Sequence, residues 1–250
     1  MPRIVRSVMD WLVPLLLLWP AALGLAWVLL SQVNFFYPLN YRLLDIGATI
    51  NQYTPQNHFG KQSFVETDLA ERERLFAAIT TAINHHGQGL AELKYHNPSG
   101  QVLGDFLTPA EVQHLTDVAR VVRVGEGISV AAFLLWLLWL GFVAWQHKPL
   151  PSLRHAVVGT LVLLGFGGLL VAIIGPIRVF DWFHRSVFPA NHAWFFYYQD
   201  SLMTTFMQAP NLFGLIVLWW LLLSITLVLG LWWIAAYGLQ RRAVKASTIH

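Results

Sequence analysis

The stretch WLVPLLLLWPAALGLAWVLLSQV, residues 11–33, contains no Lys, Arg, Asp or Glu and decides the class of this chain. Three similar charge-free runs follow it, at residues 128–145, 156–174 and 212–237. A helix needs about 20 apolar residues to cross the ~30 Å hydrocarbon core of a bilayer. Because lipid cannot hydrogen-bond the backbone, runs of this kind are typical of membrane-spanning helices. The sequence therefore predicts an all-α polytopic membrane protein with four transmembrane helices.

Composition supports this class and excludes several functions. Hydrophobic residues make up 56% of the chain and charged residues 12%, against about a quarter in soluble domains. The alternative, a soluble protein with buried core helices, fits poorly because the runs exceed ordinary core helices. Thiol–disulfide exchange needs cysteine, which is absent. The spans offer neither axial histidines for haem nor ionisable groups for a charge-coupled transporter.

Flanking charge predicts the orientation of the spans. Basic residues gather at 3–6, 147–155 and 241–245, and the positive-inside rule places these segments in the cytoplasm. Both termini are then inside, and nearly all acids lie in outer loops. The net charge of +3 is thus the sum of a basic inner rim and an acidic outer side, and it does not suggest a nucleic-acid partner. A cleaved signal peptide is the rival interpretation of the first run, which is longer than a signal-peptide core.

These observations divide the chain. We expect an N-terminal transmembrane helix in 1–33, an extracytoplasmic cap in 34–125, and three further transmembrane helices in 126–250 with a short outer segment at 178–211.

The cap is expected to be mixed α/β. Residues 34–41 (NFFYPLNY) suit an aromatic belt at the lipid headgroups, and the polar stretch 49–64 predicts a loop. Residues 67–86 predict a helix that begins after Thr67 or Asp68 and ends at a glycine. Residues 90–106 predict a β-hairpin that turns at Asn97-Pro98-Ser99-Gly100.

A capping box begins the next helix. Thr108 as N-cap, Pro109 at the first helical position and Glu111 three residues after the cap form this signature. The helix is expected to run through Val124 toward the second span. His114 lies near its beginning, and spacing alone favours an ordinary surface histidine there.

Two histidines lie beside acids in separate outer segments. Asp117 follows His114 by three residues, and Asp181 precedes His184 by three, so each pair shares a helix face. His184 belongs to an expected helix over 177–187 that continues after Gly175-Pro176 and lies within an aromatic cluster typical of a membrane interface. Histidine is the side chain that exchanges protons near neutral pH, so this pair is a candidate acid–base site.

Residues 111–118 (EVQHLTDV) resemble the E-x-x-H-M-x-D-V signature of the lipoprotein intramolecular transacylase (Lit) family, with Leu115 in place of Met. Residues 180–189 (FDWFHRSVFP) and Trp194 resemble its second motif, F-H-x-x-F-F-P followed by Trp. The order of spans and outer loops is also similar over nearly the whole chain. Residues 52–66 are longer and more polar than the family pattern, and the chain holds twelve Trp.

The resemblance implies a four-helix membrane core under an extracytoplasmic cap, in the inner membrane of the bacterial cell envelope. It implies an acyltransferase whose partners are a diacylglyceryl lipoprotein and membrane lipids. The sn-2 acyl chain would move to the α-amine of the N-terminal Cys, which gives a lyso-form lipoprotein. The family's two essential histidines fall on His114 and His184. Neither a metal nor an organic cofactor is expected.

The chemistry suits these residues. Ester aminolysis needs an amine that loses a proton and a leaving oxygen that gains one, and a histidine pair serves both needs. When both reactants belong to one molecule, proximity replaces a covalent intermediate. Which imidazole is the base stays open. Asp117 is a candidate to orient His114, and Asp181 to orient His184; the alternative is that both acids are solvated or structural. Arg178 and Tyr197 are candidate partners for the carbonyl oxygen or its oxyanion. The complete set of supporting residues is Glu111, Asp117, Asp181, Arg178 and Tyr197.

Two alternatives from other classes stay open. One is a non-catalytic membrane protein that binds lipid or lipoprotein tails. The other is an acyltransferase or hydrolase that acts on a phospholipid. An enzyme requires the imidazoles of His114 and His184 to lie within about 12 Å of each other on one site, since proton transfer spans only a few hydrogen-bond lengths.

Overall fold

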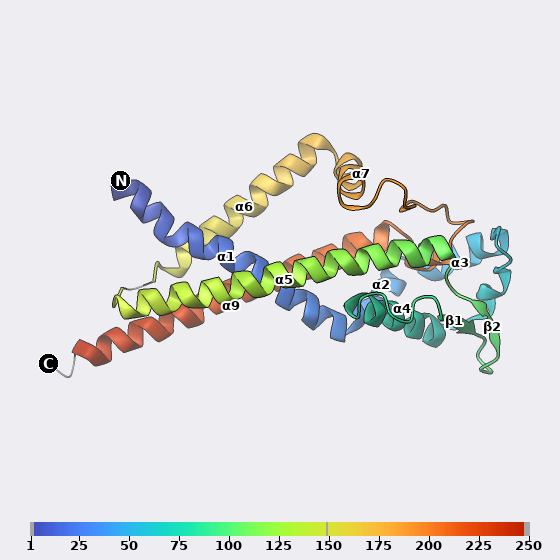
Figure 1. Cartoon of the computed structure of the whole chain (residues 1–250), viewed down its shortest axis with the longest axis horizontal. Coiled ribbons are helices and arrows are strands. Elements are labelled where there is room, and N and C mark those ends of the chain that lie inside the picture. The colour runs from blue at the N-terminus through green and yellow to red at the C-terminus, as the bar shows by residue number, and fades with distance from the viewer. Residues whose placement is uncertain (1–2, 149, 248–250) are drawn as a thin grey trace. The chain divides into compact units, whose positions relative to one another are not determined.

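The computed structural model describes residues 3–148 and 150–247, with side chains for 11–148 and 150–240. The chain is mostly helical, with one two-stranded sheet (Figure 1). Its residues divide into two compact units. The first unit takes residues 1–28, 125–179 and 220–250, and the second takes residues 29–124 and 180–219.

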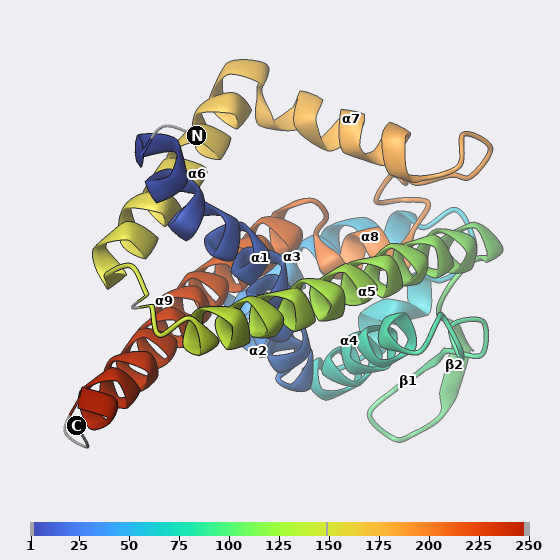
Figure 2. The ribbon, with the colours of Figure 1, turned by 60° about the vertical axis from the view of Figure 1, so that its left-hand side comes forward.

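Four helices among the described residues are long and apolar enough to cross a membrane, as expected from the charge-free runs. They are α1 (Arg3–Gln32), α5 (Pro109–Trp145), α6 (Leu153–Ile174) and α9 (Asn211–Ser247). Figure 2 shows these four helices in a second view. α5 has 37 residues, which is about 55 Å and exceeds the ~30 Å hydrocarbon core. Its apolar run begins only at Ile128, so its first turns lie before the spanning part.

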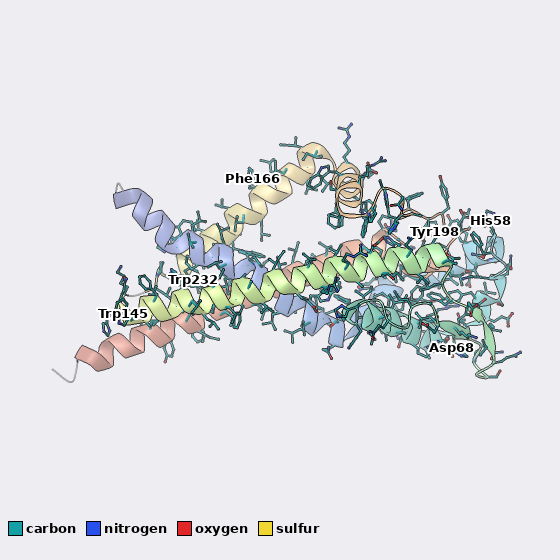
Figure 3. All side chains as sticks on the ribbon, viewed as in Figure 1. His58, Asp68, Trp145, Phe166, Tyr198 and Trp232 are labelled. Atoms are coloured by element: carbon teal, nitrogen blue, oxygen red, sulfur yellow. The ribbon has the colours of Figure 1, made fainter. Side chains whose placement is uncertain are left out.

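All four helices contribute to the core of the first unit. The buried cluster consists of Leu15, Leu18, Trp19, Ala22, Trp136, Ala156, Val228 and Trp232. Small residues let helices approach closely: a Cβ at Gly24 would collide with Ser129, and a Cβ at Gly159 would collide with Leu15. Large apolar side chains on α6 stay exposed instead, and Phe166 projects outward from it (Figure 3). Exposed apolar side chains on a spanning helix are the surface that lipid covers.

The second unit is built from short elements around aromatic side chains. Besides the end of α1, the starts of α5 and α9, and most of α7 (Pro176–Val187), its α-helices and strands are α2 (Tyr37–Leu43), α3 (Ile46–Tyr53), α4 (Leu69–Asn84), α8 (Leu202–Met207), β1 (Lys94–His96) and β2 (Val102–Asp105). Phe206 of α8 is fully buried and contacts the rings of Tyr37, Phe64 and Phe106. Tyr37 stacks on Phe76 of α4 with ring centroids 4.3 Å apart.

The predicted headgroup belt at residues 34–41 is wrong for its central aromatics. Phe35 and Tyr37 are buried, and the Tyr37 hydroxyl donates a hydrogen bond to the Phe206 carbonyl at 3.1 Å. Burial raises the pKa of Tyr37 well above its usual value. An aromatic run beside a span has the composition of an interface anchor, but here its rings supply the core of the second unit.

The predicted loop at 49–64 is also largely wrong. α3 covers Ile46–Tyr53, and 3₁₀ turns follow at Thr54–Gln56 and Gln62–Glu66. Ile46 and Ile50 lie one helical turn apart and are both fully buried. Burial of Ile46 and Ile50 against the rest of the unit explains why α3 forms. The polar residues around them hide this two-residue pattern from sequence analysis.

The helix and hairpin predicted next are confirmed with shorter bounds. Asp68 caps α4 by accepting a hydrogen bond from the Glu71 amide at 2.8 Å. β1 pairs with β2 in an antiparallel hairpin, and Asn97 Oδ1 accepts from the Gln101 amide across the turn at 2.9 Å. Gly100 has φ +83°, the left-handed conformation that glycine adopts most readily.

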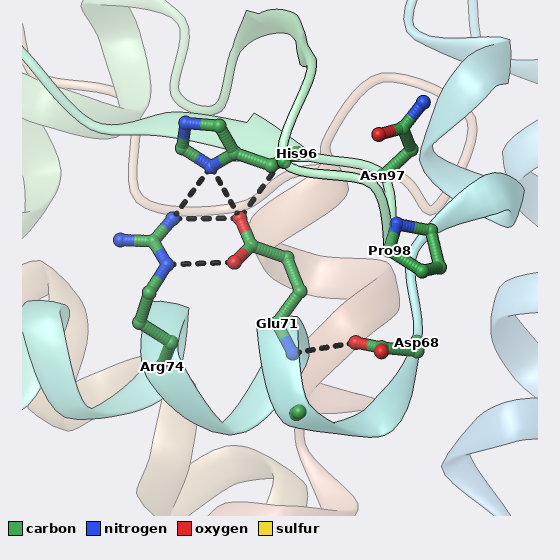
Figure 4. A pocket seen from close by; sticks show the side chains of 8 residues that line it. Asp68, Glu71, Arg74, His96, Asn97 and Pro98 are labelled. Atoms are coloured by element: carbon green, nitrogen blue, oxygen red, sulfur yellow. Dashed lines mark hydrogen bonds and ion pairs between the residues drawn. The ribbon is translucent and has the colours of Figure 1, made fainter.

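An ion-pair cluster fastens this hairpin to α4 (Figure 4). Glu71 accepts two hydrogen bonds from Arg74 at 2.6 Å, and it accepts two from His96, from the amide at 2.9 Å and from Nδ1 at 3.0 Å. Burial raises the pKa of Glu71, but the hydrogen bonds from Arg74 and His96 outweigh it, so the pKa is lowered. His96 is therefore a fixed part of the second unit rather than a solvated loop residue.

Candidate active site

The capping box predicted for α5 is confirmed. The Thr108 amide donates to Glu111 Oε2 at 2.6 Å, and the Glu111 amide donates to Thr108 Oγ1 at 3.3 Å. These bonds satisfy backbone donors that a helix start leaves without partners. They fix the first turn of α5, and that turn sets the direction in which His114 and Asp117 project.

Glu111 also holds a second helix start. Its side chain is fully buried, and Oε1 accepts hydrogen bonds from Ser201 Oγ at 2.5 Å and from the Met203 amide at 3.2 Å. Ser201 in turn caps α8 by accepting from the Thr204 amide at 2.8 Å. The carboxylate thus joins the N-termini of α5 and α8, where a negative charge is favoured. Its contacts are those of a structural anchor.

His114 is half-buried in the second unit, in the second turn of α5. Its ring meets the edge of Phe188 at a centroid distance of 5.1 Å and lies 6.0 Å from Phe196. Phe188 itself is only 8% exposed. Within the described part of the chain, the His114 ring has neither a hydrogen bond nor an ion pair. Its nitrogens are therefore available to another molecule.

His184 lies on α7 among aromatic rings. Its centroid is 4.0 Å from that of Phe180, 4.8 Å from Trp194 and 5.3 Å from Phe188. Nδ1 lies 2.8 Å from the Phe180 carbonyl oxygen. Because a carbonyl only accepts, Nδ1 carries the hydrogen, and the lone pair of the neutral ring is on Nε2.

The electrostatic surroundings of His184 favour its neutral form. Burial lowers its pKa from the ordinary value, and the opposing effects of the Phe180 carbonyl and of Asp181 are smaller. A histidine with a lowered pKa is mostly uncharged at neutral pH. His184 therefore presents an unprotonated Nε2, which is the form that accepts a proton.

The structure brings the two imidazoles together. Both contact the buried ring of Phe188, so the His114 and His184 centroids lie no farther apart than the two distances combined, 10.4 Å. The rings also interact electrostatically. This separation is within the limit of about 12 Å set for a shared proton-transfer site. Their catalytic roles stay predictions.

The expected carboxylate–histidine pairs are wrong as hydrogen bonds. Asp117 accepts from His192 Nδ1 at 2.5 Å and from Arg120 Nη1 at 3.2 Å. Asp181 accepts from Arg185 Nε at 2.8 Å. Residues three apart share a helix face, but this spacing does not specify which partner a short carboxylate meets. Asp181 acts on His184 only through space.

Sequence reasoning gave His192 no role in the site. It lies 75 residues from Asp117, and no periodic pattern links positions so far apart. The available signal was its place between Phe188 and Trp194 of the second motif.

Arg178 and Tyr197, the candidate partners of the oxyanion, have no contact with either imidazole among the described interactions, and their role stays a prediction. The Tyr197 side chain is 65% exposed and meets Phe195 edge-on at 5.2 Å. Arg178 is exposed and belongs to the first unit. Across residues 11–148 and 150–240, no group of three or more His, Asp or Glu side chains lies close enough to hold a metal ion. The site consists of imidazoles, one buried carboxylate and aromatic rings.

The sequence model of the family described as lipoprotein intramolecular transacylase Lit matches residues 13–208. The chain belongs to the Lit family. Members of this family are named for an enzyme activity, lipoprotein intramolecular transacylation, and this chain is a membrane-integral enzyme of that kind. No curated protein sequence matches the chain.

Solved structures of Lit from Bacillus cereus share the fold. One in meso structure has a TM-score of 0.62 at 15% identity and covers 100% of both chains. A second, in which a histidine is replaced by arginine, has a TM-score of 0.60 at 16% identity and covers 98% of this chain and 96% of that one. A third, with alanine at that histidine, has a TM-score of 0.59 at 16% identity and covers 100% of both. At 15–16% identity, the likeness shows that the chain shares its fold with a membrane-integral protein.

Proposed function

We propose that this Lit-family enzyme transfers the sn-2 acyl chain of a diacylglyceryl lipoprotein to the α-amine of its N-terminal Cys. A carbon–nitrogen bond forms at the acyl carbonyl, and the bond to the sn-2 glyceryl oxygen breaks. The amine loses one proton and the glyceryl oxygen gains one, so the product is an isomer of the substrate. The observation that carries this proposal is the placement of His114 and His184 on the single buried ring of Phe188.

His184 is assigned the role of base. Its Nδ1–H is held by the Phe180 carbonyl at 2.8 Å, and this bond fixes the ring orientation and leaves Nε2 unprotonated. The lowered pKa, caused by burial, keeps that form populated at neutral pH. An amine that attacks an ester becomes acidic as the new bond forms, and an unprotonated imidazole within reach removes its proton.

His114 is assigned to the leaving side. Aromatic rings surround it, and it has no hydrogen bond to the described residues, so both ring nitrogens can meet the substrate. A ring N–H donates to the oxygen on which negative charge develops, where a buried donor is worth more than in water. His184, which holds the proton taken from the amine, then passes it to the glyceryl oxygen, while the His114 N–H stabilises that oxygen by a hydrogen bond, so the proton count closes.

We also propose that the site lies at the outer face of the inner membrane, with both termini in the cytoplasm. The basic segments at 3–6, 147–155 and 241–245 support this orientation. A diacylglyceryl anchor is held in the membrane, so its acyl esters are presented at the depth of the headgroups. Reporter fusions test the topology: those near residues 60 and 190 should report outside, and one at residue 150 should report inside.

Co-expression with a lipoprotein tests the activity. Tandem mass spectrometry of the N-terminal peptide should find an N-acylated, monoacylglyceryl Cys with the unchanged chain. His114→Ala and His184→Ala should each abolish it, because general acid–base help is worth ~10²–10⁴-fold. Near-normal product from either variant refutes the assigned roles. Unmodified lipoprotein with the unchanged chain favours a lipid-binding protein, and a lysophospholipid product favours a phospholipid substrate.

A further inference from the structure

One polar link joins the outer segment after α7 to α5, next to His114. Asp117 is one turn beyond His114 and is 4% exposed. It has two partners, Arg120 and His192. The Arg120 side chain is 57% exposed, whereas that of His192 is 20% exposed. An ion pair with a solvent-exposed residue such as Arg120 contributes little to stability. His192 is therefore the main partner that stabilises the buried Asp117 carboxylate.

The link fixes one tautomer of His192. A carboxylate oxygen accepts hydrogen bonds and has no hydrogen to give, so Nδ1 of His192 donates to Asp117 Oδ2. The His192 amide donates to the Pro189 carbonyl at 3.0 Å, which closes a turn in the segment. Backbone and side chain together therefore hold this residue.

The segment from Phe188 to Phe196 has no regular secondary structure, and three attachments hold it to α5. Phe188 and Phe196 contact the His114 ring, and His192, between them in the chain, is bonded to Asp117. The His114 ring has no described hydrogen bond of its own. The two phenylalanines therefore limit how far this ring can move. The Phe188 amide also donates to the His184 carbonyl of α7 at 3.0 Å, but among the described residues of the segment the side-chain hydrogen bond to α5 comes from His192.

We infer that His192 is a positioning residue of this enzyme, which acts through Asp117 to hold Phe188 and Phe196 against His114. The expected effect of His192 on the acyl-transfer rate rests on the proposed function. The expected effect of His192 on the exposure of His114 does not. When His192 is lost, the segment should open and the His114 ring should become mobile. A displacement of about 1 Å at a reacting group can lower a rate by about a hundredfold.

Two substitutions at one position separate this role from others. His192→Ala removes the donor. His192→Asn keeps an N–H near the place of Nδ1 but has no ring nitrogen that can transfer a proton. His58→Ala is the matched control, because His58 Nδ1 pairs with Asp200 at 2.7 Å in the same chemistry but with a 68% exposed side chain.

The first readout is independent of activity. Purified full-length protein is treated with diethyl pyrocarbonate, and the modification rate of His114 is followed by mass spectrometry of its peptide. In His192→Ala the modification rate of His114 should rise about tenfold. Loss of a hydrogen bond to a charged group favours local opening of the segment by about this factor. The rate should stay near wild type in His192→Asn and His58→Ala. Equal His114 rates in wild type and His192→Ala would overturn the inference, whether or not the protein transfers an acyl chain.

The second readout is the rate of lyso-form product. We expect a loss of ten- to a hundredfold in His192→Ala and recovery to within a few-fold of wild type in His192→Asn. If His192→Asn is as inactive as His192→Ala while its His114 is protected, His192 acts on the substrate itself and the positioning role is wrong. If His192→Ala does not fold, the comparison of His192→Asn with wild type still decides, because loss of protection or activity there contradicts the inference.

Discussion

Replacing Glu111 by Ala should unfold the second unit far more readily, because this buried carboxylate joins two helix starts. Three donors lose their acceptor at once: the Thr108 amide, the Ser201 hydroxyl and the Met203 amide. Each buried polar group left without a partner costs about 1–3 kcal/mol, so the sum is about 3–6 kcal/mol after partial relaxation. For a chain of this size we expect a fall in Tm of about 6–24 °C.

The assay is thermal unfolding of the purified protein in detergent, followed by intrinsic fluorescence. Glu111→Gln is the matched variant. Its side-chain carbonyl still accepts a hydrogen bond in place of one carboxylate oxygen, but its NH₂ group faces a donor in place of the other. Its Tm should therefore lie between those of the wild type and Glu111→Ala. Glu92→Ala, at an exposed position, should leave Tm unchanged. A Tm for Glu111→Ala within about 2 °C of wild type would refute the structural role, since such a shift corresponds to about 1 kcal/mol or less.

Three further outcomes follow from other contacts. Because burial lowers the pKa of His184, its base form is lost only as pH falls through that lowered pKa, so an NMR titration of the His184 ring should have its midpoint below about 6.5; a midpoint above 7 would contradict this. Glu71→Gln should lower the protection factor of the His96 amide, which is its hydrogen-exchange rate corrected for the intrinsic rate at each pH, and acidification of the wild type through the lowered pKa of Glu71 should do the same, because that carboxylate holds the hairpin only when ionised; a protection factor independent of both would show that the cluster does not hold the hairpin. Gly159→Leu should lower Tm because its side chain meets Leu15, whereas Gly165→Leu, which faces open space, should not; equal Tm values would refute close packing of α1 on α6.

Much of the fold could be predicted because its signals are local. A charge-free run defines a span, and a capping box of Thr108 and Glu111 defines the start of α5. Asp68 and the Asn97–Gly100 turn are similar cases, in which one short stretch contains both partners of the deciding hydrogen bond. α3 was missed because its apolar stripe is only two residues long and depends on burial by distant elements.

The candidate site likewise has parts that depend on local sequence signals and parts that depend on contacts between distant residues. His114 and His184 could be named as candidates because each lies in a short motif, and the structure places both rings against Phe188. The partners of the acids could not, because Asp117 meets His192 and Glu111 meets Ser201 across long sequence separations. Helical spacing places Asp117 on the same face as His114. The Asp117 side chain nevertheless bonds to His192, in a loop whose path no sequence pattern specifies.

The most direct test of the central claim follows one labelled acyl chain in single turnover. A diacylglyceryl lipoprotein with a deuterated sn-2 chain is mixed with excess purified enzyme, and the N-terminal peptide is fragmented over time. We expect the peptide to keep its mass while the deuterated chain moves from glycerol to the Cys amine, at a rate ~10²–10⁴-fold lower for either His114→Ala or His184→Ala. Movement at the wild-type rate in either variant, or a deuterated chain that leaves the lipoprotein, would contradict it.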